Sequence, residues 1–178
     1  NDLIDTFSLL GGAQAWNEFQ SKKEDLSRWS RQTVLPEIGM DGQKKLMNAS
    51  VGVVGLGGLG CPVAQSLVMA GIGKLILIDG DDVELSNLHR QALHGPDDIG
   101  KTKIISAKES LDKINAVTKI EIIDEYLDEQ NGLDLIRNCD LIIDATDNIK
   151  TRKLIDRFSK ETNVPMIYGG LYRWEGQV

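Results

Sequence analysis

From Ser50 onward, short continuous runs of Ile, Val and Leu alternate with longer stretches in which apolar residues recur at helical spacing. Such runs are typical of strands buried on both faces of a parallel sheet, and the stretches between them are typical of crossover helices. The pattern predicts strands at residues 51–55, 74–79, 119–124, 140–145 and 164–170, and helices at 61–70, 101–115, 130–138 and 148–161. We therefore expect an α/β fold, a Rossmann-like, doubly wound and mostly parallel sheet with helices on both faces.

The charge, hydropathy and cysteine content of the chain argue against several classes of function. The chain has 178 residues, a formal net charge of −7 and no run of Lys and Arg longer than a pair, which argues against binding nucleic acid or an anionic membrane surface. The uncharged stretch 50–73 is interrupted by glycines and Pro62 and does not predict a membrane span. Cys61 and Cys139 form no CxxC pair, so we expect neither a disulfide framework nor a zinc site, and we expect a cytoplasmic protein.

The two ends of the chain depart from the alternating pattern. Residues 1–27 are expected to form an N-terminal extension, within which Leu9–Trp16 (LLGGAQAW) resembles the closing segment of a rhodanese domain. Residues 28–178 are expected to form one globular domain. The final stretch, LYRWEGQV, alternates like one strand without a terminating turn, so we expect that a C-terminal portion follows it in the natural protein.

The glycine-rich segment VGLGGLG joins the first predicted strand to the first predicted helix. Gly55, Gly57, Gly58 and Gly60 would let the backbone approach a phosphate and point amide hydrogens at it. The alternative is a tight turn that packs the helix on the strand, a role that Gly60 can have in any case. The strand–turn–helix context favours phosphate binding.

Asp79 ends the second predicted strand, where a carboxylate accepts hydrogen bonds from ribose hydroxyls in nucleotide-binding folds. A solvated acid at a strand end is the alternative. The glycine loop and Asp79 alone are as compatible with an NAD-dependent oxidoreductase as with a protein that binds another adenosine nucleotide.

The polar segment that follows Asp79, DGDDVELSNLHRQ, is longer than a dinucleotide fold needs before its next helix. Arg90, Lys101 and Lys103 are expected to converge near the glycine loop. A triphosphate requires such cations, because negative charge builds on its oxygens as pyrophosphate leaves. The alternative, a solvated basic face, is strongest for Lys101.

Two further motifs carry candidate residues. DATDN follows the fourth predicted strand, where Asp147 together with ATP suits Mg²⁺, and where Asp147 or Asn148 can also cap the next helix. RWSRQ precedes the sheet, and its Arg31 can either lie in a charged surface turn or reach the phosphates of a neighbouring subunit. The residues alone assign no chemistry to the two histidines, His89 and His94, or to Cys61 and Cys139, and both cysteines are expected to pack in the core.

Taken together, these motifs resemble the HesA/MoeB/ThiF family, bacterial relatives of ubiquitin-activating enzymes, over residues 26–178. The motifs that occur in the family's order are RWSRQ, DGQKKL, VGLGGLGCP, DGDDVELSNLHRQ, GKTK, DATDN and EGQV. The resemblance implies a homodimeric ATP-binding adenylation domain that uses Mg²⁺. It also implies that the domain adenylates the C-terminal glycine of a small ubiquitin-like sulfur-carrier protein in molybdopterin or thiamine biosynthesis.

The resemblance also implies roles for individual residues. Arg90 and Lys103 would be catalytic cations, Asp147 the metal-binding acid, and Arg31 the arginine that reaches across the dimer. The nucleotide-binding set implied is Gly55, Gly57, Gly58, Gly60, Asp79, Asp81, Ser86, Asn87, Leu88, His89, Arg90, Lys103, Asp147 and Asn148.

The chain also departs from the family pattern. The family's zinc ligands, held in CxxC pairs, are absent from this sequence. Two alternatives remain open at this point: an NAD-dependent oxidoreductase, and a nucleotide-binding dimerisation module without catalysis.

Overall fold

The strands form a five-stranded parallel sheet with the order β3-β2-β1-β4-β5 in a computed structural model that describes residues 26–178. The strands are β1 (Ser50–Val54), β2 (Lys74–Ile78), β3 (Lys119–Ile123), β4 (Leu141–Asp144) and β5 (Met166–Tyr168). The chain enters at the central strand, builds outward to one edge and then returns to build the other, which makes the sheet doubly wound. The predicted fold class is confirmed, whereas the rhodanese-like segment at 9–16 lies outside the described residues.

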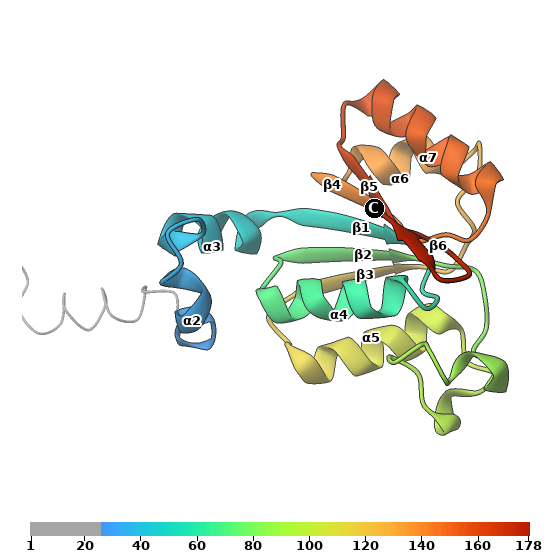
Figure 1. Ribbon diagram of the computed structural model, residues 1–178, viewed down its shortest axis with the longest axis horizontal. Helices are drawn as coiled ribbons and strands as arrows, with labels where there is room; N and C mark the ends of the chain where they lie inside the picture. The colour runs from blue at the N-terminus through green and yellow to red at the C-terminus, as the bar shows by residue number, and fades with distance from the viewer. Residues whose placement is uncertain (1–25) are drawn as a thin grey trace, which may run out of the picture.

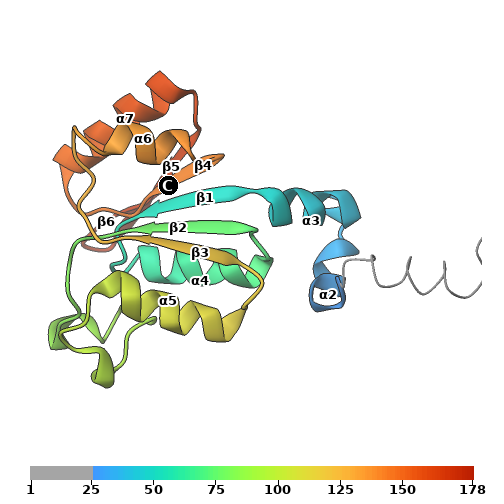
Figure 2. The same ribbon diagram turned by 180° about the vertical axis from the view of Figure 1, so that it is seen from behind.

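Helices cover both faces of this sheet (Figures 1 and 2). The helices α4 (Gly60–Ala70) and α5 (Lys103–Ile114) pack on one face, and α6 (Gly132–Arg137) and α7 (Ile149–Thr162) pack on the other. Because side chains alternate along a strand, Leu75 and Leu77 of β2 join the first core while Ile76 and Ile78 join the second. Within residues 26–178, no helix combines the length and the apolar character needed to cross a membrane.

The segment between β2 and α5 is irregular and contains two short 3-10 helices, η2 (Leu85–Asn87) and η3 (Pro96–Asp98). Its return to the sheet is fixed by Val83, whose N–H donates to the carbonyl of Lys101 and whose carbonyl accepts from Gly100. Gly100 has φ +87°, a conformation in which glycine is favoured. This turn delays the start of α5 to Lys103, two residues later than the sequence predicts.

The last residues form a hairpin of two short antiparallel strands, β6 (Gly170–Tyr172) and β7 (Glu175–Gln177). The stretch that was expected to alternate like a strand therefore forms two strands joined by a turn. Arg173 makes the turn between the strands in a left-handed conformation, with φ +56°.

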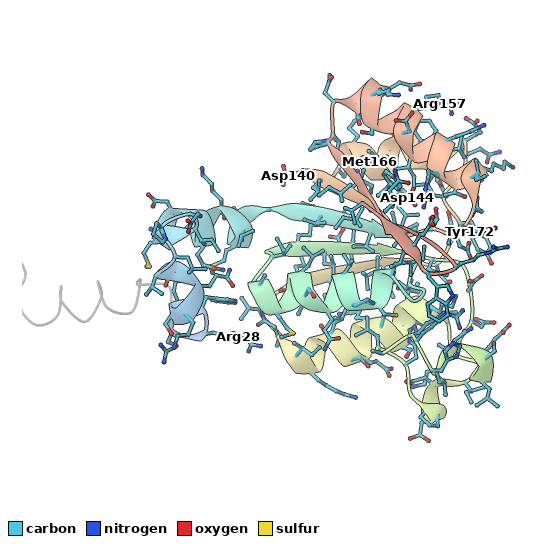
Figure 3. All side chains as sticks on the ribbon, viewed as in Figure 1. Arg28, Asp140, Asp144, Arg157, Met166 and Tyr172 are labelled. Carbon is cyan, nitrogen blue, oxygen red and sulfur yellow. The ribbon has the colours of Figure 1, made fainter. Side chains whose placement is uncertain are left out.

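The N-terminal elements η1 (Ser27–Trp29), α2 (Ser30–Thr33) and α3 (Gly39–Asn48) lie beyond the amino ends of the strands (Figure 1). Figure 3 shows Arg28 at this end, far from Asp144 at the carboxyl end of β4.

This segment caps the C-terminus of α4, whose last carbonyls have no partner within the helix. Trp29 Nε1 donates to the carbonyl of Met69 (2.9 Å), and Gln43 Nε2 donates to that of Ala70 (3.0 Å). Gly71 follows with φ +87°, and a Cβ at this position would lie 2.6 Å from the Trp29 ring. With only 5% of its surface exposed, Trp29 makes RWSRQ in part a core motif, not simply a charged surface turn.

Replacing Trp29 by Ala is expected to lower the free energy of unfolding by about 3–5 kcal/mol, because it opens a cavity under α4 and leaves the Met69 carbonyl without its donor. Equilibrium unfolding in urea measures the change. Trp174→Ala is the matched control, because Trp174 is 99% exposed and its removal should change the free energy by no more than about 0.5 kcal/mol. Equal effects of the two substitutions would contradict the capping role of Trp29.

Candidate functional site

The carboxyl ends of the parallel strands surround a cavity of about 790 Å³. Each strand contributes the segment that follows it, as expected for a doubly wound sheet. The lining comes from residues within 54–59 at the end of β1, 78–91 at the end of β2, and 125–127 after β3. It is completed by Lys103 at the start of α5, by residues within 145–152 on the β4–α7 connection and the first turn of α7, and by Gly170 and Leu171 of β6. This volume lies within the range of small-molecule sites.

The glycine loop after β1 forms one wall of the cavity. Gly55 has φ +90°, and a Cβ at Gly60 would lie 1.8 Å from the Gly55 carbonyl oxygen, so these two positions require glycine for the turn itself. Gly57 and Gly58 line the cavity at the N-terminus of α4, a position suited to anions. Gly60 is not part of the cavity lining, so it acts in packing.

Asp79 links the glycine loop to the loop after β2 by hydrogen bonds to both. The carboxylate is nearly buried, and it accepts hydrogen bonds from the backbone N–H of Leu56 (2.6 Å) and of Asp81 (2.8 Å). Burial raises the pKa of the Asp79 carboxyl, with the two backbone bonds acting in the opposite direction. A carboxylate has about four lone-pair directions, so two remain for a ligand.

Lys103 lies in the cavity wall with only 6% of its surface exposed. Its Nζ donates to Asp81 Oδ2 at 2.6 Å, and the Tyr126 hydroxyl donates to Asp81 Oδ1 at 2.5 Å. Partial burial raises the pKa of Asp81, but the hydrogen bonds from Lys103 and Tyr126 outweigh it and the net shift is downward. The bond to Asp81 raises the pKa of Tyr126 to about 12.

Arg90 reaches the cavity from the turn after η2. Its Nη1 donates to the Ser86 carbonyl (3.0 Å), and its aliphatic stem lies close to Gly58. Among residues 26–178, no carboxylate lies within ion-pair distance of its guanidinium. Arg90 therefore retains most of its N–H groups for an anionic ligand.

On the opposite side of the glycine loop, the β4–α7 connection presents Asp147. This side chain is exposed, lines the cavity and makes no hydrogen bond within the described part of the chain. The helix cap is supplied by Asn148, whose Oδ1 accepts from the Thr151 N–H at 2.8 Å. The sequence left the cap open between these two residues, and the structure leaves Asp147 free for a ligand.

Arg152, in the first turn of α7, stabilises the β4–α7 connection by hydrogen bonds. Its Nε donates to the fully buried Asp144 carboxylate (2.7 Å), and its Nη2 donates to the carbonyls of Thr146 and Gly169 (both 2.9 Å). Asp144 also accepts from the backbone and the hydroxyl of Thr146. The guanidinium thus joins the ends of β4 and β5 at the edge of the cavity.

The other predicted residues are placed as follows. Asn87 is buried, lines the cavity and accepts the Glu84 N–H at 3.0 Å, whereas Ser86, Leu88 and His89 lie outside the cavity lining. Arg31 lies on α2, at the end of the sheet opposite the cavity (Figure 1).

Lys101 does not join Arg90 and Lys103 at the cavity, contrary to expectation. Its ammonium is paired with Asp98 (2.9 Å) and Glu109 (3.1 Å) on the surface. The turn before α5 directs it there, and Arg152 takes its place as the third cation of the lining.

Sequence reasoning missed Tyr126, Arg152 and Gln91, all of which line the cavity. Each had an available signal. Tyr126 follows β3 as Asp79 follows β2, Arg152 lies one helical turn after the Asn148 cap, and Gln91 is the neighbour of Arg90.

The cysteines have the structural role predicted for them. Both are buried, and burial raises the pKa of each thiol to about 11. Cys61 Sγ lies 3.1 Å from the Leu56 carbonyl oxygen. Residues 26–178 hold no cluster of three or more His, Cys, Asp or Glu side chains able to bind a metal, which includes zinc.

Asp98 holds the loop that carries Arg90 by accepting the Gly95 N–H (2.8 Å) and the Lys101 ammonium. These bonds lower the pKa of Asp98 to about 2, below its ordinary 3.8, so its stabilising effect is full above pH 4 and is lost as the pH falls through 2. The difference in unfolding free energy between wild type and Asp98→Ala, measured in urea, should therefore shrink between pH 5 and pH 2. A constant difference over that range would contradict this role.

A doubly wound sheet with a glycine loop after β1, an acid at the end of β2 and cations around one cavity defines an α/β nucleotide-binding protein. The chain belongs to the ThiF family, whose profile matches residues 29–178.

Individual relatives agree with this placement. The chain is 42% identical over 156 residues to the sulfur carrier protein adenylyltransferase of Thermus thermophilus, covering 88% of this chain and 58% of the relative. It is 46% identical over 154 residues to the adenylyltransferase and sulfurtransferase MOCS3 of Xenopus laevis, covering 86% of this chain and 34% of the relative. The chain thus spans only part of the length of these relatives.

A solved structure shares the fold. The E. coli tRNA N6-threonylcarbamoyladenosine dehydratase TcdA, in complex with ATP, superposes with a TM-score of 0.76 at 25% identity, covering 83% of this chain and 62% of that one.

Proposed function

We propose that this chain is the nucleotide-binding part of an ATP-dependent adenylyltransferase. Its substrate would be the C-terminal glycine carboxylate of a small ubiquitin-like sulfur-carrier protein, activated as an acyl-adenylate in molybdopterin or thiamine biosynthesis. The observation that carries the proposal is the convergence of the glycine loop, Asp79, Arg90, Lys103 and Asp147 on one cavity. Relatives named as sulfur carrier adenylyltransferases support the choice of substrate.

The reaction needs alignment and charge stabilisation more than proton transfer. A C-terminal carboxylate has a pKa of about 3.5 and is ionised at neutral pH, so it can attack the α-phosphorus of ATP without a general base. A carboxylate oxygen forms the new bond to the α-phosphorus, the bond from that phosphorus to the bridging oxygen breaks, and pyrophosphate leaves. Arg90 and Lys103 would stabilise the charge that develops, and one well-placed donor is worth about 3 kcal/mol.

The charge of the cavity supports a divalent cation accompanying the triphosphate. Six acidic side chains and only three basic ones line it: Asp79, Asp81, Asp82, Glu84, Glu125 and Asp147 against Arg90, Lys103 and Arg152. A polyphosphate entering this surface needs further positive charge. Mg²⁺ is usually bound by one or two carboxylates plus phosphate oxygens, and the unpartnered Asp147 fits that requirement. When bound there, Mg²⁺ would neutralise phosphate charge.

A homodimer would supply one more cation. Arg31 lies at the opposite end of its own sheet from the cavity, so it can reach a bound nucleotide only from a second copy of the chain. We include this contact across a dimer in the proposal.

Replacing Lys103, Arg90 or Asp147 by Ala in the full-length protein is expected to lower carrier-dependent ATP–pyrophosphate exchange by at least about 10²-fold, because each loses charge stabilisation in the transition state. Lys101→Ala is the matched control, since Lys101 is a basic residue of the same segment that does not line the cavity. It should keep exchange within about twofold of wild type. Full exchange in any of the three cavity variants, with circular dichroism unchanged, would overturn this mechanism.

Nucleotide titration separates the proposal from an oxidoreductase. Asp79 and the glycine loop suit the ribose and phosphates of either ATP or NAD, but Arg90 and Lys103 suit the longer phosphate chain of ATP. Isothermal calorimetry should therefore show tighter binding of MgATP than of NAD. The reverse order would favour the oxidoreductase.

A further inference from the structure

We propose that Tyr126 is a positioning residue for Lys103 and acts through the Asp81 carboxylate. The phenol hydroxyl holds one carboxylate oxygen, and this fixes the direction in which the other oxygen holds the Lys103 ammonium at the cavity. The inference rests on the proposed function, because it takes Lys103 as a cation that binds the phosphates of ATP.

The position of Lys103 is unfavourable for a cation without a partner. Lys103 is the first residue of α5, where the helix dipole repels positive charge, and no acidic residue lies in the first turn of that helix. Its side chain is only 8% exposed, and burying an unpaired charge is strongly unfavourable. The Asp81 carboxylate compensates this charge by accepting from Nζ, and the Asp81 carbonyl, which accepts the backbone N–H of Lys103 at 2.9 Å, keeps the two residues adjacent.

Asp81 itself needs an anchor. Its side chain is 47% exposed, so without a second contact the carboxylate would rotate toward solvent and carry the ammonium with it. The only other side chain that bonds to its carboxylate in the described structure is Tyr126, at 2.5 Å from Oδ1. The two oxygens therefore have one partner each, Tyr126 and Lys103.

The Tyr126 ring is held in place by the backbone. It packs on Gly80, where an added Cβ would lie 3.0 Å from two ring carbons, so a larger residue at 80 would displace the ring. Asn131 Nδ2 donates to the Tyr126 carbonyl at 3.0 Å, and the next residue, Leu127, is buried. Glycine between the two aspartates is thus what lets a residue after β3 reach a carboxylate after β2.

Asp81 does not have to release Lys103 when a nucleotide binds. An ammonium has three N–H donors, and Asp81 uses one of them. Two donors remain for phosphate oxygens. A fixed Asp81 therefore orients the cation without removing its capacity to bind phosphate.

The test compares ligands with and without phosphates in the full-length protein. Tyr126→Phe keeps the ring and removes the hydroxyl. It is expected to weaken ATP binding about threefold to tenfold in calorimetry, while the affinity for adenosine, which has no phosphates, stays within twofold. Tyr172→Phe is the matched control, because Tyr172 is an exposed phenol outside the cavity lining, and it should change neither affinity.

A double variant shows whether the effect passes through Lys103. In a Lys103→Gln background, Tyr126→Phe should cause no further loss of ATP affinity, because the residue it positions is gone. An additive loss in that background overturns the proposal. An equal loss of ATP and adenosine affinity in the single variant also overturns it, since this would make Tyr126 a contact of the nucleoside and not a positioning residue.

Failure of the proposed function gives a different result. If the wild-type protein binds ATP but carries out no carrier-dependent exchange, the adenylyltransferase proposal fails and the binding comparison still decides the role of Tyr126. If the wild-type protein binds no ATP, both proposals are overturned.

Discussion

The site depends first on the Asp79 carboxylate, which joins two loops that the sheet alone would leave independent. One oxygen accepts from the glycine loop through Leu56, and the other accepts from the polar loop through Asp81. Because the carboxylate is almost buried, losing either bond would leave an unsatisfied polar group, which costs about 1–3 kcal/mol. The distance between the glycine loop and the acid that holds Lys103 is therefore set by one side chain.

The three cations around the cavity differ in whether a carboxylate pairs with them. Lys103 and Arg152 are each paired with an aspartate, so their positions are fixed and their charge is partly neutralised. Arg90 contacts the Ser86 carbonyl and the His89 ring, and within residues 26–178 no carboxylate pairs with its guanidinium beside Gly58. Arg90 therefore offers an incoming anion an unpaired charge, while Lys103 offers donors whose direction is already fixed by Asp81.

Much of this could be predicted from the sequence, because strand ends in a parallel sheet lie at one edge. The glycine loop, Asp79, Arg90, Lys103 and Asp147 follow strands and line one cavity. What the sequence could not supply are contacts set by packing. The bond from Tyr126 to Asp81 depends on the close approach of a ring to Gly80, and the reach of Arg152 depends on a buried Asp144. The turn at 100–102 sends Lys101 to the surface although Lys103, two positions on, faces the cavity.

The helix α4 contacts the glycine loop at its first turn and the N-terminal segment at its last turn. Its first turn belongs to the glycine loop, and its last carbonyls accept from Trp29 and Gln43 of the N-terminal segment. An 11-residue helix is about 16 Å long and bends little, so it behaves as a strut. A displacement of α2 and α3 is therefore expected to be transmitted along α4 to the glycine loop at its other end.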